Sequence, residues 1–190
     1  MNLHSLLEHS RANGPGTRAV LWMQGCGLSC PGCFNPGLKD KKDGTWISTS
    51  KALNRVLSIK GITGVSISGG EPTEQLPALL WLLTQLKSKT DLSILLFSGR
   101  TIEQITAMHG GRELVSLLDV LIDGPFDLAE TNPPGVWPSS AGQKIHLLSD
   151  RYTLMDFSLL PDMEVVITKE GEVMQTGLWG ALPLNPVNYD

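Results

Sequence analysis

The chain has 190 residues, long enough for a sizeable core, and we expect a single domain over residues 1–190. Its composition, 41% hydrophobic and 18% charged, is that of a globular protein, and no apolar run approaches the roughly 20 residues that span a bilayer. The net charge of −4 argues against nucleic acid or an acidic membrane as a partner, and the first residues lack the basic start and apolar core of a secretory signal, so we expect a cytoplasmic protein.

Two strands are predicted near the N-terminus, separated by a turn. Residues 3–8 are rich in apolar side chains and predict a strand or an extended arm. Residues 13–16, Asn-Gly-Pro-Gly, have the composition of a turn. The apolar run over residues 19–24 is typical of a strand that is buried on both faces.

All three cysteines of the chain lie within eight residues, directly after this second strand. Cys26, Cys30 and Cys33 are separated by three residues and then by two, with Gly, Pro and Ser among them. A tight loop of this composition can direct several sulfurs at one point. Thiolates suit iron–sulfur clusters, zinc and copper(I), and three of them can hold a 4Fe–4S cluster that keeps one iron open to a substrate.

Other roles for these cysteines need weighing. Three cysteines are one ligand short of a structural zinc site, so zinc with His4 or His9 as the fourth ligand stays an alternative. The histidines otherwise show no pairing pattern and are expected to be structural or exposed. Cysteines that were merely small buried residues would be scattered along the chain, and short loops seldom allow the geometry of a disulfide.

From residue 48 to residue 123 the chain alternates predicted helices with short apolar strands. Ser48 or Ser50 can cap a first helix that runs to about residue 59. Leucines recur at helical spacing in a second helix, from Thr73 or Glu74 to about residue 87. Thr101 caps a third helix that runs to about residue 109. The remaining short helix is predicted at residues 112–118, and the strands at residues 64–68, 92–97 and 119–122.

Each of these strands ends in small or acidic residues. Glycines at a strand end permit positive φ and the close approach of a ligand, and a carboxylate beside them can pair with an ammonium group. In barrel-like α/β folds the chemistry sits at the carboxyl ends of the strands. The three strand ends are Gly69-Gly70-Glu71-Pro72, Ser98-Gly99-Arg100 and Asp123-Gly124-Pro125.

The last third of the chain is less regular. Residues 127–142 form the longest stretch without periodicity, and long ordered loops tend to be functional or mobile. The tail from residue 178 is rich in Pro and Asn and is expected to lie over the surface. The elements predicted between them are strands at residues 144–148 and 163–168, then a hairpin turn at residues 169–172 into a strand at residues 173–176.

The cysteine spacing and its surroundings resemble those of a known family. Three residues and then two between cysteines is the signature of radical S-adenosylmethionine (SAM) enzymes. The stretch from Asn13 to Cys26, closed by Cys33-Phe34-Asn35-Pro36, resembles the activating enzymes of glycyl-radical enzymes, most closely the anaerobic ribonucleotide reductase activase group. Many radical SAM proteins have an aromatic residue just before the third cysteine; here Gly32 stands there and Phe34 follows, and the activase group also tends to show Gly-Cys-Phe-Asn.

The resemblance implies an α/β fold, an incomplete (β/α)6-type radical SAM barrel of about six parallel strands with short additions at both ends. It implies that Cys26, Cys30 and Cys33 hold three irons of a 4Fe–4S cluster, whose fourth iron binds the amino and carboxylate groups of SAM. Reductive cleavage of SAM then gives methionine and a 5′-deoxyadenosyl radical, which abstracts a hydrogen atom. No catalytic residue is expected beyond the cluster and the SAM site.

The resemblance also implies which side chains contact SAM. The Gly-Gly-Glu-Pro sequence resembles the motif whose backbone and Glu hold the amino group of SAM. Ser98 lies where relatives have a hydroxyl-Gly pair near SAM, and Asp123 lies where a carboxylate can accept hydrogen bonds from a ribose. Relatives often carry Lys two residues after this Asp, whereas this chain has Pro125. The candidate SAM-binding residues are Gly69, Gly70, Glu71, Pro72, Ser98 and Asp123.

The implied partners are a glycyl-radical enzyme as the protein substrate and a low-potential electron donor such as flavodoxin or ferredoxin. The small size of the chain fits a macromolecular substrate, because it leaves no second domain for a small-molecule pocket. Two alternatives stay open: a radical SAM enzyme that modifies a peptide or a small molecule, and a non-enzymatic metal-binding module.

Overall fold

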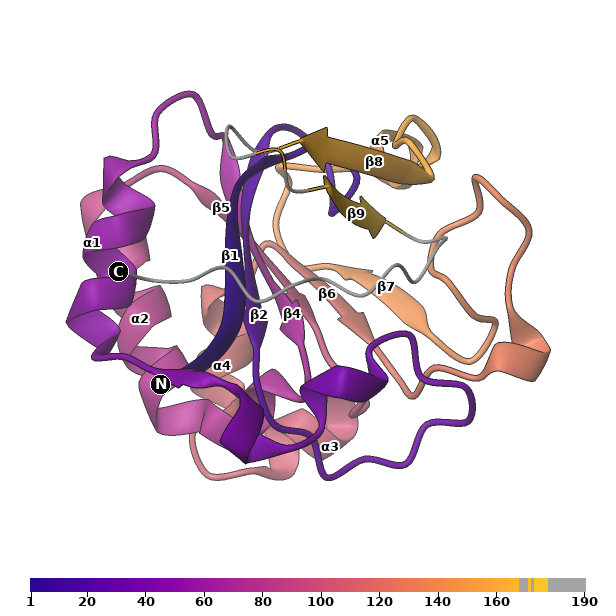
Figure 1. Ribbon diagram of the computed structural model, residues 1–190, viewed down its shortest axis with the longest axis horizontal. Coiled ribbons are helices and arrows are strands. Elements are labelled where there is room, and N and C mark those ends of the chain that lie inside the picture. The colour runs from indigo at the N-terminus through magenta and orange to yellow at the C-terminus, as the bar shows by residue number, and fades with distance from the viewer. Residues whose placement is uncertain (168–170, 172, 178–190) are drawn as a thin grey trace.

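A seven-stranded mixed sheet lies at the centre of this α/β protein (Figure 1). The computed structural model describes residues 1–167, 171 and 173–177. Within the sheet the strands follow the order β3-β1-β2-β4-β5-β6-β7. Their bounds are β1 Asn2–Ser10, β2 Arg18–Met23, β3 Thr45–Trp46, β4 Gly64–Gly69, β5 Ser93–Phe97, β6 Val120–Asp123 and β7 Lys144–Leu147.

The parallel part of the sheet consists of four neighbouring strands. β2, β4, β5 and β6 run parallel, whereas β1, β3 and β7 pair with their neighbours in the antiparallel direction. The prediction of about six parallel strands is therefore wrong. A further parallel strand next to β6 would need a long crossover connection, usually a helix. Residues 124–143, all of which the structure describes, contain a single 3₁₀ turn, Leu128–Glu130, so the chain returns antiparallel as β7.

The two C-terminal strands form a sheet of their own instead of extending the large one. β8, Met163–Ile167, pairs antiparallel with β9, Val173–Gly177, as expected for a hairpin. The predicted turn at residues 169–172, apart from Gly171, and the tail from residue 178 lie outside the described residues.

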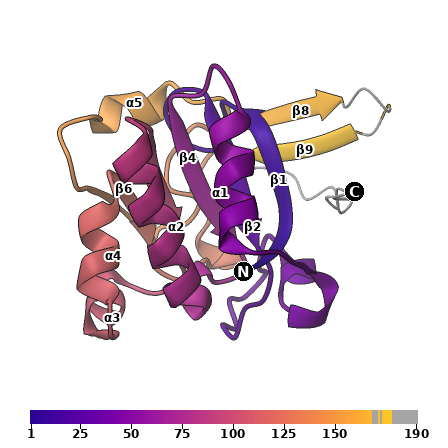
Figure 2. The ribbon, with the colours of Figure 1, turned by 90° about the vertical axis from the view of Figure 1, so that its left-hand side faces the viewer.

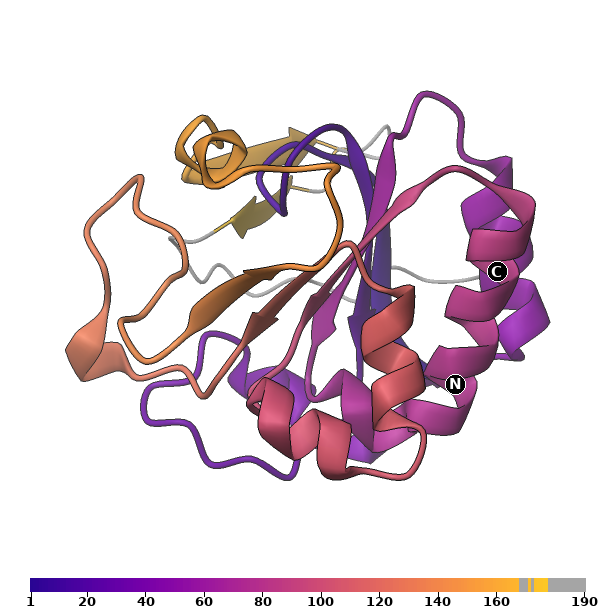
Figure 3. The ribbon, with the colours of Figure 1, turned by 180° about the vertical axis from the view of Figure 1, so that it is seen from behind.

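Helices α1 to α4 pack on one side of the large sheet, and α5 packs on the other (Figures 2 and 3). Two predicted caps are present: Ser48 accepts a hydrogen bond from Lys51 N, and Thr101 forms a capping box with Gln104. None of the helices in the described part of the chain is long and apolar enough to cross a membrane. The bounds are α1 Thr49–Ser58, α2 Leu76–Lys89, α3 Ile102–Ala107, α4 Gly111–Leu117 and α5 Leu154–Ser158.

The two faces of the parallel strands are packed differently, because successive side chains point to opposite faces. On the helix-covered face, apolar side chains of all four strands form the main core with α1 to α4. On the other face, Trp22 belongs to one small apolar cluster, and Leu95 and Ile122 belong to another. β4 lies between them and presents Ser66 and Ser68, whose small side chains fill little space. A cavity lies on this face at the strand ends.

Arg18 closes the opposite end of the parallel strands. It is fully buried, and its guanidinium donates to Ser66 Oγ (2.7 Å), Ser93 Oγ (2.8 Å) and Val65 O (2.8 Å). Burial lowers the pKa of this guanidinium from its ordinary value. The network ties β2, β4 and β5 together at the end away from the cysteines.

Candidate metal centre

The cysteine loop follows β2, and hydrogen bonds bring its two ends together. Gly25 N donates to Leu38 O (2.8 Å), and Gln24 Nε2 donates to Asp40 O (2.7 Å). The residues between these contacts, including all three cysteines, therefore form a closed loop at the carboxyl end of the parallel strands.

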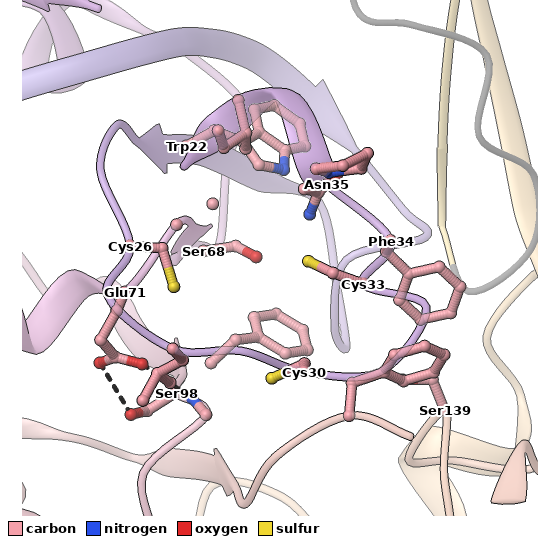
Figure 4. A pocket seen from close by; sticks show the side chains of 18 of the residues that line it. Trp22, Cys26, Cys30, Cys33, Phe34, Asn35, Ser68, Glu71, Ser98 and Ser139 are labelled. Atoms are coloured by element: carbon pink, nitrogen blue, oxygen red, sulfur yellow. Dashed lines mark hydrogen bonds between the residues drawn. The ribbon is translucent and has the colours of Figure 1, made fainter. Parts of the chain in front are cut away.

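All three cysteines line one cavity of about 490 Å³, which lies on the face of the sheet opposite α1 to α4. Cys26, Cys30 and Cys33 are half-buried free thiols, and Figure 4 shows their sulfurs around a common space. The described residues contain no group of three histidine, cysteine or carboxylate side chains close enough to hold one metal ion. Zinc–sulfur bonds are only about 2.3 Å long, so a zinc ion would need the three sulfurs to meet at one point.

The two histidines that could complete a zinc site have other contacts. His4 Nδ1 lies 3.1 Å from Gln24 Oε1, and His9 Nε2 lies 2.8 Å from Lys60 O. Three free thiols that line one cavity without meeting at a single-ion site fit a 4Fe–4S cluster, whose cysteines bind separate irons, better than they fit zinc. Cys26, Cys30 and Cys33 are thus the residues that could hold such a cluster.

The Cys26 thiol lies among groups that oppose its ionisation. Burial raises the pKa of this thiol, and the nearby carboxylates of Glu71 and Glu74 raise it further. A bound metal centre would reverse this preference, because a coordinating thiol is deprotonated. The electrostatics of the loop therefore favour a thiolate at Cys26 only with a cationic centre beside it.

Gly69 and Gly70 let the end of β4 pack directly on the backbone of the cysteine loop. A Cβ on Gly69, whose φ is +110°, would overlap Met23 N, and a Cβ on Gly70 would overlap Gly25 O. Main-chain hydrogen bonds run from Gly70 N to Met23 O (2.8 Å) and from Glu71 N to Gly25 O (2.9 Å). The cysteine loop and the Gly-Gly-Glu-Pro sequence are therefore one unit in space, and both glycines line the cavity.

Glu71 is fully buried and joins the ends of β4 and β5. Its Oε1 accepts hydrogen bonds from Ser98 Oγ (2.9 Å; Figure 4) and from Thr73 through both N and Oγ1, and its Oε2 accepts one from Gly99 N (2.9 Å). These donors compensate for the removal of the carboxylate from water. Glu71 and Ser98 both line the cavity, so two of the predicted SAM contacts lie side by side in its wall.

The side chains of the other two candidates, Asp123 and Pro72, do not line the cavity. The buried Asp123 carboxylate accepts a hydrogen bond from Ile102 N at the start of α3, and it lies 2.9 Å from His146 Nε2 without hydrogen-bond geometry. Its neighbour Gly124 lines the cavity instead. Pro72 is buried and begins the 3₁₀ turn Pro72–Gln75. Both residues shape the site through the main chain beside them.

Glu74 is a residue of the site that sequence analysis did not single out. Its Oε1 accepts a hydrogen bond from Gly27 N inside the cysteine loop (2.6 Å), and its Oε2 lies 3.0 Å from Lys41 Nζ. Burial acts to raise the pKa of Glu74, but the Gly27 N–H and Lys41 lower it by more, so the carboxylate stays ionised. An acidic residue at this position equally fits the first turn of a helix, so the sequence carries no distinct signal for this role.

A second set of contacts holds the loop at the end that carries the third cysteine. The ring centroids of Phe34 and Phe126 lie 4.1 Å apart, and Leu128 N donates to Pro31 O (3.1 Å). Phe126 and Leu128 belong to the segment after β6. This long aperiodic segment therefore packs against the cysteine loop and forms another wall of the cavity.

Comparison with known proteins agrees with this site. A family model described as "4Fe-4S single cluster domain" matches residues 12–146, which include the cysteine loop and the ends of the parallel strands. A Vibrio cholerae protein is 32% identical over 161 residues, which cover 81% of this chain and 100% of the relative. A protein of enterobacteria phage T4 is 30% identical over 155 residues, which cover 76% of this chain and 93% of the relative. A protein of Escherichia coli K12 is 28% identical over 162 residues, which cover 78% of this chain and 99% of the relative. All three are called anaerobic ribonucleoside-triphosphate reductase-activating proteins.

The family model and the cavity with three thiols define the class, an iron–sulfur protein with a single 4Fe–4S cluster. The chain belongs to the family of anaerobic ribonucleoside-triphosphate reductase-activating proteins. The resemblance to radical SAM activases is thereby confirmed, and the protein is a radical SAM enzyme with a 4Fe–4S cluster and SAM as its cofactors.

Proposed function

We propose that this protein cleaves SAM reductively to a 5′-deoxyadenosyl radical and installs a glycyl radical on an anaerobic ribonucleotide reductase. The observation that carries the proposal is the placement of three thiols and the Gly-Gly-Glu strand end around one cavity. The likeness to activating proteins over nearly their whole length supports the choice of substrate.

Each part of the cavity wall has a role in this proposal. Cys26, Cys30 and Cys33 would hold three irons, and the cluster, when bound, supplies the electron that breaks a carbon–sulfur bond of SAM. The main chain at Gly69 and Gly70 can approach the amino group of SAM closely because no Cβ intervenes. The sheet would be a shortened radical SAM barrel, with an open side for a large substrate.

Glu71 can still accept a hydrogen bond from the SAM ammonium group. Oε1 takes the donors from Ser98 and Thr73, whereas Oε2 takes one from Gly99 N. A carboxylate oxygen has two lone pairs, so Oε2 keeps one acceptor site. We assign Ser98 a contact with SAM from the same wall, and we assign Pro72 and Asp123 the positioning of the backbone beside it.

The electron and the hydrogen atom complete the reaction. A low-potential donor such as flavodoxin or ferredoxin would reduce the cluster. With one electron, one SAM would give methionine and the 5′-deoxyadenosyl radical. That radical would take a hydrogen atom from a glycine Cα of the reductase, leaving 5′-deoxyadenosine and the glycyl radical.

Anaerobic turnover tests the proposal. The protein is reconstituted with iron and sulfide, reduced and mixed with SAM and the reductase of the same cell; 5′-deoxyadenosine is quantified and the glycyl radical is followed by electron paramagnetic resonance. We expect both products from the wild type and neither from Cys30→Ala, which loses a cluster ligand. 5′-Deoxyadenosine without a radical on the reductase would point to another substrate. No product from a protein with full iron content would count against the whole proposal.

A further inference from the structure

The hairpin of β8 and β9 is held to the rest of the molecule by one of its faces. Glu164 Oε2 accepts hydrogen bonds from Ser10 Oγ (2.8 Å) and Arg11 N (3.0 Å) at the end of β1. On β9, Thr176 Oγ1 accepts one from Asn13 Nδ2 (2.9 Å). Figure 2 shows the hairpin projecting past β1, on the side away from α2 and α4. The inner face, with Glu164 and Thr176, is therefore already used by the fold.

The other face of the hairpin is apolar and exposed. Successive side chains of a strand point to opposite faces, so the neighbours of the anchoring residues point outward. This outer face consists of four large apolar side chains, each exposed by 45% to 70%: Met163, Val165, Ile167 and Val173. A sheet face in contact with water usually carries polar side chains instead. A group of exposed apolar side chains on one face indicates an interaction surface.

The outer face continues into the wall of the cavity. In the register of the hairpin, Val165 lies opposite Gln175 and Met163 lies opposite Gly177, so these four residues share one face. Gln175 and Gly177 both line the cavity that the three cysteines line. The Gln175 amide also contacts Met163 Sδ. A macromolecule that reaches into the cavity past β9 therefore meets the outer face as well.

The hairpin lies outside the part of the chain that the family model matches. The match ends at residue 146, whereas β8 begins at Met163. The cysteine loop and the ends of the parallel strands, which carry the common chemistry, all lie within the matched residues. A surface on the hairpin is thus suited to recognising a particular partner rather than to the reaction itself.

We propose that the outer face docks an apolar surface of the protein substrate, beside the segment that carries its radical glycine. The inference rests on the proposed function and names where that substrate is recognised. A second copy of this chain fits the face less well. Two strands of five residues cover an area of roughly 170 Å², whereas a stable interface buries about 800 Å² on each partner. The outer face is therefore part of a larger interface, and the surface that it continues is the rim of the cavity.

The test compares recognition of the reductase with cleavage of SAM in reconstituted full-length protein. The triple variant Val165→Thr, Ile167→Thr and Val173→Thr makes the outer face more polar and keeps β-branched residues, which favour strands. Val165→Ile with Val173→Ile keeps the face apolar and is the matched control. Trp81→Gln removes an exposed apolar side chain from α2, on the other side of the sheet. The quantities measured are the Kd for the reductase, its KM in glycyl-radical formation, the 5′-deoxyadenosine formed without reductase, the urea midpoint of unfolding and the molecular mass in solution.

We expect the triple variant to bind the reductase at least about tenfold more weakly and to raise the KM for it by a similar factor. Each methyl-sized apolar group that no longer leaves water on binding costs about fourfold in affinity, and three side chains lose one. SAM cleavage without the reductase, the urea midpoint and the mass should stay as in the wild type, because the outer face contacts neither the cysteine loop nor the anchors of the hairpin. Both controls should match the wild type within about twofold in every measurement.

Four results would overturn the inference. They are unchanged reductase affinity in the triple variant, no binding of the reductase to the wild type, a wild-type dimer that the triple variant loses, and a urea midpoint lower in the triple variant than in the controls. The third would assign the outer face to a second copy, and the fourth to another segment of the chain. Failure of the proposed function is distinct. A wild type that binds the reductase in the expected pattern but forms no glycyl radical would contradict the function alone, whereas radical formation with unchanged KM in the triple variant would contradict the inference alone.

Discussion

At the scale of single residues, two acidic residues hold the cysteine loop at its first cysteine, Glu71 through its main-chain N–H and Glu74 through its carboxylate. Glu71 N and Glu74 Oε1 contact the loop at Gly25 and Gly27, on either side of Cys26. Both acidic residues belong to the segment that follows β4. The position of Cys26 is therefore coupled to the strand end that is proposed to bind SAM.

Glu74→Ala should weaken the hold of the protein on its cluster. The change removes the acceptor of the Gly27 N–H and the partner of Lys41. A hydrogen bond to a charged group contributes about 1.5–3 kcal/mol, so we expect iron loss to a chelator to be about tenfold faster. Glu74→Gln keeps an acceptor, so its rate of iron loss should lie between those of Glu74→Ala and the wild type. Glu113→Ala, an exposed change on α4, is the control. Equal iron retention by Glu74→Ala and wild type would show that the contact is dispensable.

At the scale of elements, the segment after β6 secures the other end of the cysteine loop. The contact depends on Phe126, which is buried and packs at a tilt against the ring of Phe34, and on the hydrogen bond from Leu128 N to Pro31 O. Gly32 permits this approach, because a Cβ there would overlap the side chain of Leu128. The glycine that replaces an aromatic residue before the third cysteine thus has a packing reason.

Phe126→Leu should loosen this end of the loop and leave the fold intact. The substitution keeps an apolar side chain but removes a ring pair, at a cost of about 1 kcal/mol in the free energy of unfolding. Hydrogen exchange should become faster at Gly32, Cys33 and Leu128, whereas amides of α2 should exchange as in the wild type. Unchanged exchange in the loop would mean that Phe34 and Phe126 do not hold it.

At the scale of the whole molecule, Asp119 joins three parts of the chain. Its carboxylate accepts hydrogen bonds from Lys87 Nζ of α2, Ile94 N of β5 and Ser149 Oγ after β7, each at 2.8 Å. Burial acts to raise the pKa of Asp119, but these donors lower it by more, and the pKa ends below its ordinary value. A carboxylate with a lowered pKa stabilises the fold above its unfolded-state pKa and loses that effect as the pH falls through the folded-state pKa.

Asp119→Asn should therefore destabilise the protein at neutral pH and matter less in acid. We expect a loss of about 2 kcal/mol in the free energy of unfolding by urea at pH 7, the size of hydrogen bonds to a charged group. The gap between variant and wild type should narrow below about pH 4, where an unfolded aspartate begins to protonate. The Asp91 side chain is 92% exposed, so Asp91→Asn should lower the free energy of unfolding by less than about 1 kcal/mol at any pH. A gap that stays constant into acid would rule out this role of the Asp119 charge.

Much of the fold follows from local patterns in the sequence. Buried strands appear in the sequence as short apolar runs, and the leucines of α2 recur at helical spacing. The predicted bounds of these elements therefore lie close to the observed ones. Two points differ. α2 begins at Leu76 because a 3₁₀ turn precedes it, and β7 is antiparallel because no crossover helix precedes it.

The sequence by itself determined the family, the three thiols and the small residues at the strand ends, because each is a pattern of neighbouring residues with its own chemistry. The tertiary structure decided which side chains meet. It placed Asp123 against Ile102 N and His146, and it brought Glu74 to Gly27 and Trp137 to the cavity. Such contacts join residues far apart in the chain, and their partners depend on how whole elements pack. No local pattern of residue types encodes that packing.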